Sequence, residues 1–220
     1  SPELALTGSG FRSESFAYLA ELEASNFWFR ARNKIIVWAL RFHFGPISSL
    51  FEVGCGTGYV LSGIAAEFPN ARLVGSEIFV AGLKHAAVRL PTATLVQLDA
   101  KRIPYVDEFD VAIAVDVIEH IDQDEKVLSQ LFCAVKPGGG ILISAPQHKW
   151  LWSQSDEYAC HVRRYNSRDL HRKIREAGFV IQKSTSFVTF LLPLMLASRL
   201  QNRKSVEFDP QKEFDIPRWV

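Results

Sequence analysis

The sequence predicts an α/β fold built on a doubly wound, mostly parallel sheet. Short apolar runs such as VAIAV (111–115) and ILIS (141–144) are typical of strands buried on both faces, as parallel sheets require. These runs alternate along the chain with segments of helical periodicity, the order expected for strands joined by covering helices. The predicted strands are 50–53, 72–78, 94–98, 111–115, 141–144 and 179–184, and the predicted helices between them are 60–68, 80–90, 123–135 and 168–177.

Helix ends give two further local predictions. Asp122, followed three residues later by Glu125, resembles an acidic variant of the capping box at a helix N-terminus. Gly178 follows the last predicted helix, where a left-handed residue commonly ends a helix.

The chain divides into three predicted parts. Residues 1–46 are expected to form an N-terminal helical cap with two helices, the second over 33–44. Residues 47–186 are expected to form the core, with a sixth strand over 180–186. Residues 187–220 form an apolar insert and a charged tail, in which no seventh strand is evident.

Composition excludes several classes of protein. With 25 Lys and Arg against 24 Asp and Glu, the net charge of +1 gives no general attraction to nucleic acid or anionic membranes. Three separated cysteines form neither a disulfide framework nor a zinc site, which favours a reducing, cytoplasmic location. The N-terminus lacks the blocks of a secretory signal. The apolar stretch 187–197 is shorter than the roughly 20 residues of a membrane-spanning helix, so we expect at most peripheral membrane contact there.

The most informative motif is the glycine-rich segment FEVGCGTGYV (51–60). An apolar strand leads into Gly54, Gly56 and Gly58 and then into a helix, an arrangement in which backbone can approach an anionic ligand closely. Tyr59 stands where a dinucleotide-binding motif has its third glycine, and no Lys-Ser or Lys-Thr pair follows as in a phosphate-binding P-loop. Taken alone, the glycines are equally consistent with a plain turn.

Two acidic residues favour a nucleoside site. Glu77 ends the second predicted strand, where a carboxylate can accept hydrogen bonds from ribose hydroxyls. Asp99 ends the third strand at the same edge of the sheet. Each acid alone would be an ordinary strand end. The glycine loop, Glu77 and Asp99, however, follow three successive strands, and this match is hard to attribute to chance.

Together these segments resemble a class I S-adenosylmethionine-dependent methyltransferase of the type 11 and type 12 kind. The resemblance rests on EVGCGTG, SEI, LDA, FDVAIAVDVIEHI and VKPGGGILIS, which cover the core in the family's order. It implies a Rossmann-like sheet of order 3-2-1-4-5-7-6, without an evident strand seven here. It also implies S-adenosyl-L-methionine as cofactor and S-adenosyl-L-homocysteine as product. The PGGG segment (137–140) is expected to be a structural turn before strand five.

The resemblance also implies roles for individual residues. The glycine loop would surround the methionine and ribose parts of the cofactor, and Glu77 would hold the ribose hydroxyls. The adenine would pack on Ile78, with its amino group on Asp99 and a backbone contact from Ala100. Asp116 would face the methyl group and the acceptor. The implied cofactor-binding residues are Gly54, Cys55, Gly56, Gly58, Glu77, Ile78, Asp99, Ala100 and Asp116.

Glu119 and His120 follow the fourth strand and have two interpretations. By resemblance to related methyltransferases they could provide a base or a metal-assisted acceptor site. Alternatively, they form a polar helix start in which His120 is hydrogen-bonded to backbone, and we favour this structural interpretation. No residue is assigned as a metal ligand, although a divalent metal stays open as a second cofactor.

Two segments are expected to border the acceptor. In DEYACHVRRY (156–165), His161 could act as a base, and Arg163 and Arg164 could bind an anionic group. His161 and His120 are therefore the candidate catalytic residues. In NFWFRARN (26–33), aromatic residues could form a lid, with Arg30 or Arg32 near the cofactor carboxylate.

The predicted function is methyl transfer to a small or lipid-like acceptor, with oxygen favoured as the methylated atom. Two alternatives stay open: a non-catalytic nucleoside-binding regulatory domain, and an NAD-dependent oxidoreductase, which the glycine spacing disfavours. A nucleic-acid substrate is disfavoured because DVIE, rather than an N-P-P type motif, follows strand four. The sequence does not predict the oligomeric state.

Overall fold

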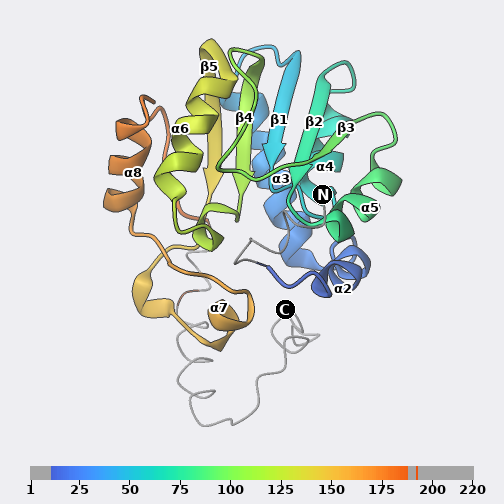
Figure 1. Cartoon of the computed structure of the whole chain (residues 1–220), viewed down its shortest axis with the longest axis vertical. Coiled ribbons are helices and arrows are strands. Elements are labelled where there is room, and N and C mark those ends of the chain that lie inside the picture. The colour runs from blue at the N-terminus through green and yellow to red at the C-terminus, as the bar shows by residue number, and fades with distance from the viewer. Residues whose placement is uncertain (1–10, 188–191, 193–220) are drawn as a thin grey trace.

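The computed structural model describes residues 11–187 and residue 192. Within these residues a sheet of five parallel strands has the order β3-β2-β1-β4-β5 (Figure 1). The strands are β1 (Ser49–Val53), β2 (Arg72–Glu77), β3 (Thr94–Gln97), β4 (Phe109–Val115) and β5 (Val135–Ser144). The α-helices are α2 (Ser15–Leu22), α3 (Phe27–His43), α4 (Tyr59–Glu67), α5 (Val80–Arg89), α6 (Asp124–Ala134), α7 (Gln154–Tyr158) and α8 (Ser167–Glu176). Two 3₁₀ helices are η1 (Ile118–His120) and η2 (Lys149–Leu151).

Strand β4 shows why the apolar runs form buried strands. Its side chains alternate between the two faces of the sheet, and both faces are covered by helices (Figure 1). Val111 and Ile113 pack with apolar residues of α3 and α4, whereas Ala112 and Ala114 pack with those of α6. Burial on both faces explains the continuous apolar run and confirms the predicted fold class.

The strand order indicates at which end of the sheet ligands bind. From β1 the chain continues to β2 and β3 on one side of the sheet, and then crosses to β4 and β5 on the other side of β1. In such a sheet, a crevice opens beyond the carboxyl ends of β1 and β4, where the direction of the connections reverses. Figure 1 shows α2 and α7 lying beyond this end of the sheet. Ligand-binding residues are therefore expected in the loops that follow β1, β2, β3 and β4.

The predicted sixth strand is wrong for the described residues. Residues 179–186 follow α8 but form no strand. Val180 is 80% exposed, so this side chain is not buried against the core as it would be in an internal strand. A strand needs a neighbouring strand for its backbone groups, and no described segment pairs with β5 on its outer side.

Two local predictions about α6 and α8 had different outcomes. Helix α6 begins at Asp124 rather than after an Asp122 cap, and the residue at the cap position, Gln123, makes no side-chain cap. The Asp124 carboxylate instead accepts the Tyr165 hydroxyl at 2.6 Å, so a long-range contact fixes this end of the helix. The Gly178 prediction is confirmed, because its φ is +106°.

The glycine segment before strand five is part of the strand. Residues 137–140 lie within β5, where the pairing with β4 shifts register between Phe109 and Val111. The segment therefore contains an irregularity in the strand rather than a separate turn.

Helix α3 begins six residues before its predicted start, at Phe27. Asn26 caps it by accepting the Trp28 N–H at 2.9 Å. The aromatic and basic residues of the NFWFRARN segment therefore lie at the first turns of a helix.

The apolar insert lies almost wholly outside the described residues. Phe187 stacks on Trp28 with ring centroids 5.6 Å apart, whereas 188–191 and 193–220 are not described. That any membrane contact over 187–197 is at most peripheral therefore stays a prediction. Among the helices described, none combines the length and the apolar character that a membrane crossing requires.

Candidate functional site

The loop between β1 and α4 needs residues without a side chain. Gly54, Gly56 and Gly58 have φ values of +67°, +53° and +76°. A Cβ on Gly54 would also lie 2.5 Å from Cγ2 of Val117, which is closer than side chains approach. The Cys55 N–H donates to the Ser76 carbonyl at 2.8 Å and holds the loop against β2. The loop, called the glycine cradle below, therefore packs too closely against Val117 to accept a side chain at Gly54.

Glu77 lies directly beside this cradle. Its Oε2 accepts the Gly56 N–H and its Oε1 accepts the Phe79 N–H, each at 3.1 Å. Burial raises the pKa of Glu77, and the two backbone N–H groups act in the opposite direction. Each carboxylate oxygen has further lone-pair capacity, so both can still accept hydrogen bonds from ligand hydroxyls.

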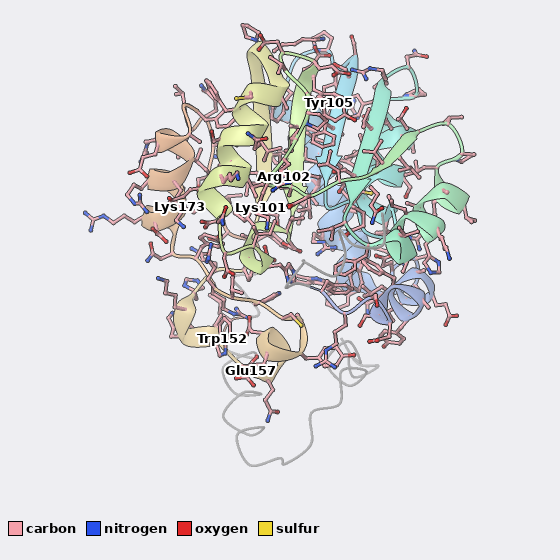
Figure 2. All side chains as sticks on the ribbon, viewed as in Figure 1. Lys101, Arg102, Tyr105, Trp152, Glu157 and Lys173 are labelled. Atoms are coloured by element: carbon pink, nitrogen blue, oxygen red, sulfur yellow. The ribbon has the colours of Figure 1, made fainter. Side chains whose placement is uncertain are left out.

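The predicted adenine-binding residues lie along the same cleft. Ile78 follows β2, and Asp99 and Ala100 follow its neighbour β3. Asp99 accepts the Lys101 N–H at 2.9 Å, and Nζ of Lys101 is 3.6 Å from its carboxylate. Figure 2 labels Lys101 on the segment that leads from β3 to β4. The structure thus brings these three predicted residues to one side of the glycine loop.

Asp116 follows β4 at the other side of the loop and has a φ of +54°, which is unusual for a residue with a side chain. Its Oδ1 accepts the Ser144 hydroxyl at 2.7 Å, and its Oδ2 forms an ion pair with Arg32 of α3. Of the two arginines considered for the lid, Arg32 lines the cleft. Arg30 is exposed and lines a separate shallow groove.

The N-terminal helices are fastened to the glycine loop by a buried ion pair. Glu23, which follows α2, accepts the Thr57 hydroxyl at 2.6 Å and Nη1 of Arg89 at 2.5 Å. Arg89 also donates to the Thr57 hydroxyl at 2.7 Å and to the Ala20 carbonyl at 2.7 Å. Phe16 of α2 is buried beside Gly56, because a Cβ built on that glycine would lie 3.7 Å from the Phe16 ring. Helix α2 therefore covers the loop.

Glu52 is a third acidic group of the cleft, and sequence analysis assigned it no role. It lies on β1 within an apolar strand and is 2% exposed. Its Oε2 has no hydrogen-bond partner among the described residues. Burial raises the pKa of Glu52 to about 8, with Arg32 acting in the opposite direction. The sequence did contain a signal for Glu52: an acidic residue in the middle of an apolar strand is unusual and indicates a buried carboxyl group.

Glu119, His120 and His161 meet on the acceptor side of the cleft. Each offers a ligand atom, and these atoms lie within 4.8 Å of one another. The two imidazole rings are in contact, with centroids 4.7 Å apart. Burial and the neighbouring His161 lower the pKa of His120 to about 4. Burial, together with Asp116, raises the pKa of Glu119 well above its usual range.

His161 is held by a buried carboxylate. Nδ1 of His161 lies 2.9 Å from Oδ1 of Asp156, whose side chain is fully buried. Asp156 also accepts Nε of Arg164 at 2.6 Å and the Ser153 N–H at 2.9 Å. Burial acts to raise the pKa of Asp156, but these hydrogen bonds prevail and lower it to about 2.

The two arginines beside His161 are both engaged within the chain. Arg164 donates to Asp156 and to the Gln147 carbonyl. Arg163 pairs with Asp124 at 2.8 Å and donates to the Asp122 carbonyl. These contacts position the segment 146–165, and the predicted binding of an anionic group by Arg163 and Arg164 stays a prediction.

The fold and this site define a class I S-adenosylmethionine-dependent methyltransferase. The donor set fits the cofactor, because Glu77 lies beside the glycine loop and keeps lone pairs for ribose hydroxyls. Residues 19–184 match the model of a family described as a methyltransferase domain, and the chain belongs to this family.

Individual relatives agree with this assignment. A "probable S-adenosylmethionine-dependent methyltransferase" of Mycolicibacterium smegmatis is 28% identical over 164 residues, covering 73% of this chain and 62% of that protein. A trans-aconitate 2-methyltransferase of Paracidovorax citrulli is 34% identical over 104 residues, 46% of this chain and 40% of that protein. The chain therefore spans less than two thirds of the length of these relatives.

A solved structure shares the fold. Phosphoethanolamine N-methyltransferase 2 of Haemonchus contortus, in complex with S-adenosyl-L-methionine, superposes with a TM-score of 0.63 at 20% identity. The match covers 81% of this chain and 46% of that chain. At this identity the likeness shows the fold alone.

Proposed function

We propose that this chain transfers the methyl group of S-adenosyl-L-methionine to an oxygen atom of a small or lipid-like acceptor. The cofactor supplies a methyl group already activated as a sulfonium. The chain must therefore align the acceptor, exclude water and receive the acceptor's proton where one is lost. The observation that carries the proposal is that the glycine loop lies against Val117 and so adjoins η1, where His120 contacts the His161–Asp156 pair.

On the cofactor side, we assign the glycine loop, with Gly54, Cys55, Gly56 and Gly58, to the methionine and ribose parts. Glu77 is assigned to the ribose hydroxyls, because its oxygens face the loop and keep lone pairs.

The adenine is assigned to the neighbouring strand ends. Ile78 packs on the ring, Asp99 accepts from its amino group, and Ala100 provides a backbone contact. The placement of these residues just after the adjoining strands β2 and β3 supports this assignment.

On the acceptor side, His161 is the group proposed to receive the proton. Because Asp156 pairs with Nδ1, the other ring nitrogen, Nε2, is left to accept. Asp156 and Arg164 orient the imidazole, as a buried carboxylate does in other histidine bases. His120 packs against His161 and is the second candidate, and Asp116 faces the methyl group.

The proposal also includes a role for the N-terminal helical cap and a cellular location. The described part of the cap, residues 11–46, closes over the core (47–186) through the Glu23–Arg89 pair and Arg32. Three unpaired cysteines, Cys55, Cys133 and Cys160, support a cytoplasmic location.

The test is a methyl-transfer assay with isotope-labelled cofactor and a panel of phenols, carboxylic acids and lipid alcohols. We expect a methylated oxygen in the product, and a loss of kcat of about 10²-fold or more for His161→Ala. His171→Ala, on α8 and in contact with Ser184 rather than with a proposed site residue, is the matched control and should resemble the wild type. A methylated nitrogen would overturn the choice of acceptor atom. Equal kcat for His161→Ala and wild type would overturn the role of His161.

A further inference from the structure

Large aromatic side chains from three segments of the chain are exposed to solvent. Trp150 and Trp152 are 60% and 40% exposed, and Phe27, at the first turn of α3, is 45% exposed. Phe187 is also exposed, and Trp28 stacks against it. We call these five residues the aromatic surface. Exposed aromatic side chains that gather in one place mark an interaction site.

Two contacts bring the three segments together. The Ser186 hydroxyl donates to the side-chain carbonyl of Gln147 at 2.5 Å. The next residue, Phe187, stacks on Trp28 with ring centroids 5.6 Å apart. Gln147 in turn leads directly into the turn that carries Trp150. The aromatic residues of the three segments therefore form one surface.

The fold holds the turn with the two tryptophans in place. Between them, Leu151 is buried, and its N–H donates to the His148 carbonyl at 2.9 Å. The His148 N–H donates to the carbonyl of the buried Tyr165, also at 2.9 Å. The turn is thus anchored to the core on both sides, and the two indole rings project from a fixed position.

The charges around the aromatic surface favour an anionic partner. The segments 26–34, 146–152 and 179–187 contain no Asp or Glu. Their exposed basic residues are Arg30, Lys34, Lys149 and Lys183. Anionic lipid headgroups attract such residues, whereas the interfaces between proteins are depleted in Lys. The charge pattern therefore fits a membrane better than a second protein.

The sequence beyond Phe187 agrees with a lipid partner. Residues 188–197, VTFLLPLMLA, contain no charged side chain and follow directly on the residue that stacks on Trp28. Tryptophan prefers the boundary between lipid headgroups and the apolar interior of a bilayer. We propose that the aromatic surface binds the face of an anionic lipid bilayer, from which the chain takes a lipid acceptor.

The aromatic surface is connected to the proposed base. Ser153 directly follows Trp152, and its N–H donates to the Asp156 carboxylate at 2.9 Å. Asp156 holds His161 at 2.9 Å. Figure 2 shows Trp152 beyond the carboxyl ends of the strands and beside α7. A chain bound to the bilayer in this way holds His161 near the lipid headgroups. The lipid acceptor rests on the proposed function, whereas the membrane contact does not.

The test is flotation of the purified full chain with vesicles, without cofactor or acceptor. We expect binding to vesicles of equimolar phosphatidylcholine and phosphatidylglycerol, and roughly tenfold weaker binding to phosphatidylcholine alone. The double variant Trp150→Ala/Trp152→Ala should lower the partition coefficient at least tenfold. Lys149→Gln, which keeps both indoles, should lower it roughly fivefold.

Trp38→Ala is the matched control, because it removes an indole that is 55% exposed. Trp38 lies in the second half of α3, which leads into the start of β1 and so lies toward the amino ends of the strands. This variant should bind vesicles like the wild type. Circular dichroism identifies any variant that fails to fold. Brominated phosphatidylcholine in the vesicles should quench tryptophan fluorescence in the wild type, and much less in the double variant.

Three results would overturn the membrane contact. They are no binding of wild type to either kind of vesicle, equal binding by wild type and the double variant, and a larger mass for wild type than for the double variant by light scattering. The last result would mean that this surface joins copies of the chain. Titration of the same samples with S-adenosyl-L-homocysteine, which the double variant should bind like wild type, separates these failures from failure of the proposed function.

Discussion

Arg32 of helix α3 forms an ion pair with Asp116, which follows β4, across 84 residues of sequence. Asp116 has a left-handed backbone conformation, and Ser144 holds its second carboxylate oxygen. The N-terminal helices and the acceptor side of the cleft are therefore joined by one charged contact. Because the Arg32 side chain is 14% exposed and that of Asp116 is 31% exposed, the contact is partly screened by solvent.

This pair should be energetically coupled, but only modestly. In a double-mutant cycle of Arg32→Met and Asp116→Asn, measured by chemical denaturation, we expect a coupling free energy of about 1 kcal/mol. The pair Arg41–Glu67, with exposures of 74% and 33%, is the control and should show less. Additive effects of the Arg32 and Asp116 substitutions would contradict the pairing.

Gly54→Ala should disrupt the cofactor cradle. The substitution places a Cβ 2.5 Å from Val117 at a φ of +67°, so we expect a loss of about 1–3 kcal/mol in stability. Binding of S-adenosyl-L-homocysteine should weaken at least tenfold. The control is Gly45→Ala, where a Cβ would have no atom within 4 Å. If both variants bind equally well, the cradle is placed wrongly.

The buried Glu23–Arg89 pair should contribute to both stability and cofactor binding. Arg89→Met leaves the Glu23 carboxylate buried without its cation, which should cost about 3 kcal/mol in thermal or chemical unfolding. The same variant should bind S-adenosyl-L-homocysteine less tightly, because Thr57 of the glycine loop loses a contact. Arg72→Met removes the exposed pair with Glu108 and should cost less than about 1 kcal/mol. Equal losses in the two variants would argue against the role of burial.

Glu52 should make stability depend on pH. Its pKa is about 8 in the folded chain, against 4.5 as the ordinary value. Between these values the folded state holds a proton that the unfolded state has lost, so raising the pH destabilises the fold. We expect wild type to lose up to about 1.4 kcal/mol per pH unit between pH 4.5 and 8 relative to Glu52→Gln. Denaturation series at several pH values measure this, and parallel curves for the two proteins would refute it.

The sheet and the cofactor side could be predicted because their signals are local in sequence. Strand β4 is a continuous apolar run, and the glycines stand at positions whose φ values are positive. Glu77 and Asp99 stand at strand ends, which parallel strands bring to one edge. The sixth strand could not be judged in this way, because strand formation at 179–186 depends on a partner strand rather than on its own residues.

The acceptor side of the cleft could not be predicted in the same way, because it depends on contacts between residues that no sequence pattern relates. Arg89 lies 66 residues from Glu23, and no pattern relates them. Asp156 and His161 are close in sequence, yet only the fold brings His161 to Glu119 and His120. At the start of α6 a local rule failed: the sequence predicted a cap at Asp122, whereas the helix begins at Asp124, whose carboxylate accepts a hydrogen bond from the distant Tyr165.

The most direct test of the account is calorimetric titration of the purified chain with S-adenosyl-L-homocysteine and, separately, with NAD. The account predicts one-to-one binding of S-adenosyl-L-homocysteine, no binding of NAD, and an affinity at least tenfold lower for Glu77→Ala, whose carboxylate faces Gly56. Binding of NAD alone, or unchanged affinity in Glu77→Ala, would contradict it.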